Sequence, residues 1–85
     1  MRRSIDDHPQ AEDDIPPGVD DAVAMTWAVA VCDDYDDSQP RVVLTLEEAG
    51  RAGAGLVAHL RPTSARRLQA ALAAGLREVG EGPSR

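Results

Sequence analysis

The sequence predicts an α+β fold: a three-stranded antiparallel β-meander that carries one C-terminal amphipathic helix on one face (βββα). Two periods support this prediction. Bulky and small residues alternate over 25–32 and again over 41–46, as in strands, whereas leucines recur at steps of three and four after residue 63, as in a helix. Residues 1–22 show neither period. We therefore expect a single small domain over 23–80, preceded by an acidic, disordered tail over 1–22 and followed by a frayed terminus over 81–85.

The first segment, "MRRSIDDHPQAEDDIPPGVDDA", contains seven acids and three prolines. Such a composition cannot bury enough apolar surface to offset the loss of chain entropy. No apolar stretch follows Arg2 and Arg3, so we do not expect a signal peptide. Two interpretations stay open for this segment. It is a solubilising tail, or it is an arm that orders on a basic partner or on the protein's own arginines.

The strands are expected at 25–32, 41–46 and 55–60. A polar break, "DDYDDSQP", separates the first two and makes them a hairpin with a long loop. The stretch 47–60 has an alternative, because Thr45 and Glu48 have the spacing of a helix capping box. Three glycines over 50–55 would each cost a helix about 1 kcal/mol, and we therefore favour a turn followed by a strand.

The clearest element is the helix in "PTSARRLQAALAAGLREVG", with Thr63 or Ser64 as the N-cap and Gly80 at the end. Its apolar stripe is expected to pack on the bulky face of the sheet. The residues of that stripe are Ala65, Leu68, Leu72, Leu76 and Val79.

The segment "LVAHLRPTSARRLQAALAAGLREVG" resembles the strand and Thr/Pro-capped, Ala/Leu/Arg-rich helix that end many small uncharacterised proteins of high-GC actinobacteria. This resemblance covers about 25 residues. It implies an origin and supports a strand over 56–60, and it brings neither an activity nor site residues. The absence of lysine, asparagine and phenylalanine agrees with such an origin.

Charge is divided unevenly along the chain. Residues 1–40 hold eleven acids and two arginines, residues 41–85 hold seven arginines and four acids, and the net charge is −6. This balance disfavours binding to nucleic acid through net charge, although the second half could present a local basic patch. The single cysteine allows no internal disulfide, and no apolar run is long enough to span a bilayer. We expect a cytoplasmic protein.

A domain of this size has a marginal core, and oligomerisation is a usual remedy. The small-residue face of the sheet would let another surface approach closely, which makes it our candidate dimer face, with an exposed strand edge as a second option. The alternative is that this sheet face is exposed to solvent and contacts no other surface. The residues of the candidate dimer face are Ala28, Ala30, Cys32, Val43, Val57 and His59.

The acidic break is a candidate interaction loop formed by Asp33, Asp34, Tyr35, Asp36 and Asp37. Part of it has the spacing of a calcium loop, but Gln39 stands where glycine is needed and Thr45 where a bidentate acid belongs. Cys32 and His59 share a predicted face without a third group to orient them. We therefore predict no metal, no cofactor and no catalytic residues, and hence no enzyme.

The start of the helix offers a candidate anion or partner patch, because its free N–H groups and nearby guanidinium groups attract anions. The patch consists of Arg61, Thr63, Ser64, Arg66 and Arg67. A meander places the aspartate loop at this same end of the sheet, so the arginines could instead pair with the protein's own acids.

These features predict a small non-catalytic protein-interaction or regulatory protein, homodimeric, with an unknown protein partner and no membrane association. The alternative is a nucleic-acid-associated regulatory factor that uses the arginine patch. The net charge and the presence of only two aromatic residues for stacking, Trp27 and Tyr35, weigh against that alternative.

Overall fold

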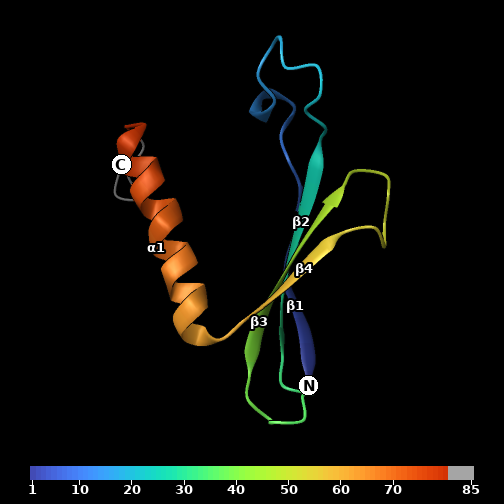
Figure 1. The fold of residues 1–85 in the computed structure, drawn as a ribbon, viewed down its shortest axis with the longest axis vertical. Helices are drawn as coiled ribbons and strands as arrows, with labels where there is room; N and C mark the ends of the chain where they lie inside the picture. The colour runs from blue at the N-terminus through green and yellow to red at the C-terminus, as the bar shows by residue number, and fades with distance from the viewer. Residues whose placement is uncertain (81–85) are drawn as a thin grey trace.

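The computed structural model describes residues 1–80 and has an α+β fold, in which a four-stranded antiparallel sheet precedes one C-terminal helix (Figure 1). The predicted class is therefore confirmed. The expected frayed terminus at 81–85 lies outside the described residues. The strands follow one another across the sheet in the order β1-β2-β3-β4, and their bounds are β1 Arg2–Pro9, β2 Met25–Cys32, β3 Arg41–Glu48 and β4 Leu56–Leu60.

The sheet has four strands, not three, because the segment expected to be a disordered tail supplies β1. β1 pairs with β2 over Arg2↔Cys32 to Pro9↔Thr26, with an irregularity between Ser4 and Asp6. Every β1 side chain is exposed. Backbone hydrogen bonds rather than apolar burial hold this strand, which is why a prediction from composition missed it.

The rest of the acidic segment connects β1 to β2. It contains a short 3-10 helix, Glu12–Asp14, and projects beyond the end of the sheet (Figure 1). Gln10 closes the connection, since its backbone N–H donates to the Met25 carbonyl at 2.8 Å and its side-chain oxygen accepts from the Met25 N–H at 2.9 Å.

The middle of the sheet follows the alternation of the sequence. Register pairs Trp27 with Leu46 and Val29 with Leu44 on one face, and Ala30 with Val43 on the other. The capping-box alternative fails, since β3 continues through Thr45 to Glu48 and a glycine turn leads into β4. Gly50 and Gly53 have φ of +83° and +86°, values that favour glycine, which confirms the turn-plus-strand prediction.

Helix α1 spans Pro62–Glu78. It begins two or three residues earlier than predicted, because Arg61 rather than Thr63 or Ser64 is the N-cap and Pro62 occupies the first turn, where its missing N–H has no cost. Thr63 and Ser64 therefore lie inside the helix. The C-terminal end of α1, at Glu78, lies two residues before the predicted end at Gly80. Gly80 itself adopts a φ of +83°.

The helix stands apart from the sheet, contrary to the predicted packing. After Leu60 the chain turns away, and α1 runs back beside the sheet at an angle (Figure 1). The described chain therefore has almost no core: only Cys32 and Val43 are buried. The radius of gyration is 15.1 Å, whereas a compact chain of this length has about 12 Å. A chain this open leaves apolar side chains exposed.

Candidate interaction surfaces

A groove with a volume of about 620 Å³ lies between α1 and the bulky face of the sheet. Its walls are apolar except for one amide side chain, Gln69. The sheet contributes Val29, Val42, Leu44 and Leu60, and the helix contributes Ala65, Leu68, Gln69, Leu72, Ala73 and Leu76. We call this surface the helix–sheet groove.

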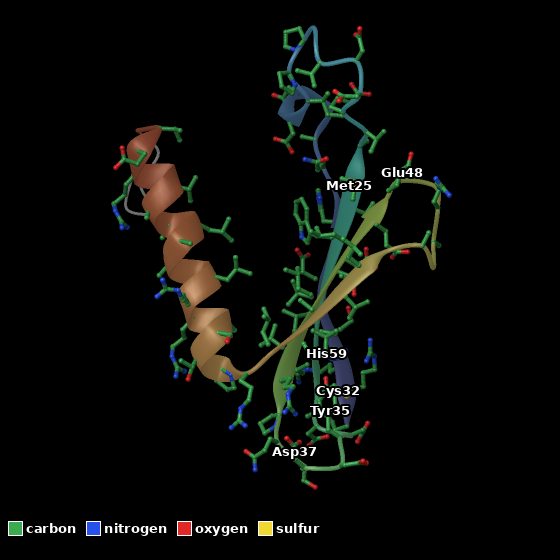
Figure 2. The ribbon with its side chains drawn as sticks, viewed as in Figure 1. Met25, Cys32, Tyr35, Asp37, Glu48 and His59 are labelled. Atoms are coloured by element: carbon green, nitrogen blue, oxygen red, sulfur yellow. The ribbon has the colours of Figure 1, made fainter. Side chains whose placement is uncertain are left out.

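Figure 2 shows side chains of α1 that extend toward the sheet, and the three leucines that α1 contributes to the helix–sheet groove are all exposed. Leu72 is 64 % exposed and Leu76 is 47 % exposed. Farther along the same sheet face, Leu56 is 80 % exposed. Exposed apolar patches of this kind are typical of interaction surfaces.

One edge of this sheet face is closed by polar contacts from β1. The Trp27 indole N–H donates to Asp6 Oδ2 at 2.9 Å, and the His8 ring stacks on Trp27 with 5.3 Å between centroids. Sequence reasoning missed this contact. The indole N–H of Trp27 could have predicted it. An indole on a packed face needs a hydrogen-bond acceptor, and an acidic segment precedes Trp27 in the chain.

The small-residue face presents the candidate dimer residues in two groups. Cys32 and Val43 are buried and Ala28 and Ala30 are half-buried, whereas Val57 and His59 are exposed on β4. Part of this face is covered from within the chain, since the Tyr35 phenol oxygen lies 2.9 Å from His59 Nδ1 (Figure 2).

The aspartate loop is held by internal contacts. Asp37 accepts two hydrogen bonds from the Arg41 guanidinium, at 3.0 and 2.7 Å, and this guanidinium also lies 4.7 Å from the centroid of the Tyr35 ring. Asp33 and Asp34 accept from the Met1 ammonium group at 2.6 and 2.5 Å. The candidate interaction loop is therefore partly neutralised where it meets the sheet.

The surroundings of the loop shift the pKa of three of its residues, and the Met1 ammonium group lowers the pKa of Asp33. The Arg41 guanidinium, together with the Gln39 backbone N–H, holds the pKa of Asp37 well below its usual range. Burial and the neighbouring Cys32 thiol raise the pKa of Tyr35. The carboxyl pKa values fall because an ion pair favours the charged carboxylate, and the Tyr35 pKa rises because a less polar site disfavours the phenolate.

The candidate arginine patch lies at the first turn of α1, where Arg61, Arg66 and Arg67 are exposed. None of the three forms an ion pair with an acid in residues 1–80. The expected proximity to the aspartate loop holds for Arg61, whose charge contributes to the low pKa of Asp37, but Arg41 is the main partner. Arg41 begins the next strand, four residues after Asp37, and the sequence analysis assigned it no role.

Within residues 1–80, no three His, Cys, Asp or Glu side chains are grouped so that they could hold a metal ion. The described chain also contains no helix that is both long and apolar enough to cross a membrane.

Comparison with known proteins gives no further assignment, since no family model, curated protein or solved structure matches the chain significantly.

Proposed function

We propose that this chain is a small non-catalytic protein-interaction or regulatory protein that works as a homodimer, and that the helix–sheet groove is its principal binding surface. One observation carries the proposal: an open apolar groove of about 620 Å³ lies between α1 and the sheet, and its single polar lining side chain is Gln69. Catalytic pockets need converging acids, bases or nucleophiles, whereas apolar grooves of this kind suit protein segments.

The exposed area supports the same conclusion. The protomer exposes 6715 Å², whereas a compact monomeric protein of its mass exposes about 4,850 Å². The excess is about 1,900 Å², and a stable protein–protein interface covers about 800 Å² on each partner. The protomer therefore has ample surface for a specific interface.

Helix α1 also supports association. A helix of 17 residues is marginal on its own in water, because most helical stability in proteins comes from packing an amphipathic face. Here that face is open, with Leu68, Leu72 and Leu76 all exposed. Complete burial of a fully exposed leucine contributes about 1.5 to 3 kcal/mol. Covering each of these partly exposed leucines contributes a part of that free energy.

Sedimentation equilibrium tests the proposal. We expect the wild-type chain to sediment at twice its mass of 9.0 kDa at micromolar concentration. Leu72→Glu, which puts a charge into the groove, is expected to give a monomer. Ala70→Glu is the matched control, because residue 70 lies about 200° around the helix from residue 72. A wild-type monomer at all concentrations, or equal effects of both variants, would contradict the proposal.

A second candidate function is association with nucleic acid through the arginine patch, favoured by the exposure of Arg61, Arg66 and Arg67. Its test is fluorescence anisotropy with random-sequence duplex DNA. If this function holds, binding weakens steeply with salt and is lost when Arg66 and Arg67 are replaced by alanine. Binding that is absent at low salt removes this candidate.

A further inference from the structure

We infer that the helix–sheet groove is closed by a second copy of this chain, whose α1 lies antiparallel to the first across the two-fold axis. This inference rests on the proposed homodimer and specifies its arrangement. Four properties of the described residues support it: side-chain size along the stripe, charge along the helix, the acids on the groove side of the sheet, and the length of the elements.

Side-chain size is self-complementary only in the antiparallel direction. When the groove-lining segment 65–76 is reversed onto itself, each bulky residue meets a smaller or more flexible one. Ala65 faces the partner's Leu76, Leu68 faces the partner's Ala73, and Gln69 faces the partner's Leu72. A parallel pair would set leucine against leucine and alanine against alanine. Alternation of large and small residues across an interface permits close packing, and a two-fold interface must be self-complementary.

Charge favours the same direction. α1 has no acid in its first turn and carries Arg66 and Arg67 in its second, whereas its last turn holds both Arg77 and Glu78, whose charges cancel. An antiparallel partner therefore brings its two arginines toward an end without net side-chain charge, and the opposed helix dipoles attract. A parallel partner would place four arginines and two positive helix ends together, at a cost in repulsion.

Two acids, Asp6 and Glu48, lie on the groove side of the sheet. Leu60 and Ala65 lie at the end of the groove where the chain turns from β4 into α1, whereas Met25 and Glu48 mark the opposite end of the sheet (Figure 2). Asp6 lies on this same sheet face beside Trp27. The arginines of an antiparallel partner approach this end of the sheet, where Glu48 is already paired with Arg51 at 3.1 Å and Asp6 is the acid that has no cationic partner among the described residues.

Length agrees as well. An α-helix of 17 residues is about 25 Å long, and β2 and β3, with eight residues each, extend about 27 Å. The partner's α1 therefore matches the sheet face that it covers. A single helix of another protein would fit the length, but not the reciprocal size pairing that α1 makes with its own reverse.

Disulfide trapping tests the direction of the pair. In a Cys32→Ala background, Ala65→Cys and Leu76→Cys are prepared separately, checked for folding and dimer mass, then mixed and oxidised. We expect a linked dimer only in the mixture, because identical positions lie about 16 Å apart along an antiparallel pair. If each single variant links with itself, the helices are parallel and the inference is overturned. If no sample links while the wild type sediments as a dimer and Leu72→Glu as a monomer, the groove forms the dimer in another arrangement, and the inference fails while the proposed function stands.

A second variant covers the case in which the cysteine variants do not fold. Arg66→Gln with Arg67→Gln is compared with Arg2→Gln, whose arginine lies on β1 opposite Cys32, on the other face of the sheet. The antiparallel arrangement predicts that the helix variant raises the dimer dissociation constant about fivefold at low salt. A lower dissociation constant for the helix variant would indicate that the arginines cluster in a parallel pair. An unchanged dissociation constant would indicate that the helix ends do not meet. Either result overturns the inference. A wild-type monomer would instead remove the homodimer itself.

Discussion

The Tyr35 phenol oxygen lies 2.9 Å from His59 Nδ1, and this contact joins the aspartate loop to the edge strand β4. Tyr35 follows β2 in the chain, so its side chain reaches across β3 to make the contact. Val43 lies on β3 directly opposite His59 and is only 2 % exposed. The best-buried position of the described chain therefore lies beneath an interaction between a loop and an edge strand.

The ionisation of Tyr35 gives the first prediction. Burial, with the nearby Cys32 thiol, raises its pKa in the folded protein, whereas an unfolded tyrosine titrates at about 10. The stabilising contribution is therefore complete below the unfolded value and is lost as pH rises through the folded value. Absorbance titration in buffer and in urea tests this, since Tyr35 is the only tyrosine. A native midpoint at or below the midpoint in urea would contradict it.

The Asp37–Arg41 ion pair gives the second prediction. Because the folded pKa of Asp37 is depressed, its contribution is complete above the ordinary value of about 3.9 and is lost as pH falls toward the folded value. Arg41→Gln is expected to raise the pKa of Asp37, measured from its carboxyl resonance by NMR. Arg51→Gln is the control, because Arg51 pairs with Glu48 instead, at 3.1 Å. Equal Asp37 titrations in both variants would exclude Arg41 as the main cause.

The Trp27–Asp6 hydrogen bond predicts how firmly β1 is attached. Asp6→Ala removes the acceptor of the indole N–H and is expected to weaken the local stability of β1 by roughly 1 kcal/mol. Amide hydrogen exchange of residues 2–9 measures this, with Asp7→Ala as the control, since Asp7 pairs with Ala28 on the other face. If the amides of wild-type β1 exchange as fast as in an unfolded peptide, the original expectation of a disordered segment stands.

Burial of Val43 gives the fourth prediction. Val43→Ala is expected to lower the free energy of unfolding by about 2 kcal/mol, because it removes packed methyl groups and leaves a cavity. Val57 lies on the same sheet face but is 53 % exposed, so Val57→Ala should cost less than about 0.5 kcal/mol. Urea denaturation measures both variants. Similar midpoints for the two would show that the small-residue face is not the core of the protomer.

Much of the fold follows from local pattern. The alternation around Trp27 and Val29 predicts β2, and the leucine spacing after Ser64 predicts α1, because side-chain period reports which face of an element is apolar. The glycines at 50 and 53 predict a turn for the same kind of local reason: a residue without a Cβ tolerates positive φ. The interaction loop and the arginine patch could likewise be located from composition alone.

The candidate site could not be predicted in the same way. The helix–sheet groove depends on the direction in which the chain leaves Leu60, and a helical period does not specify which surface covers the stripe. The sequence analysis placed the leucines against the protein's own sheet, which would have left no groove. Arg41 was missed for a related reason, since its pairing with Asp37 requires the loop to fold back on the start of β3.

The amino-acid sequence by itself determined the α+β class, β2, β3, β4, the helix, and the acidic character of the first half, because each depends on residues close together in the chain. Only the tertiary structure decided the fourth strand and the open groove. β1 is held by backbone hydrogen bonds to a strand some twenty residues away, which an acidic composition conceals. The groove results from the angle between α1 and the sheet, a relation between whole elements that no local period contains.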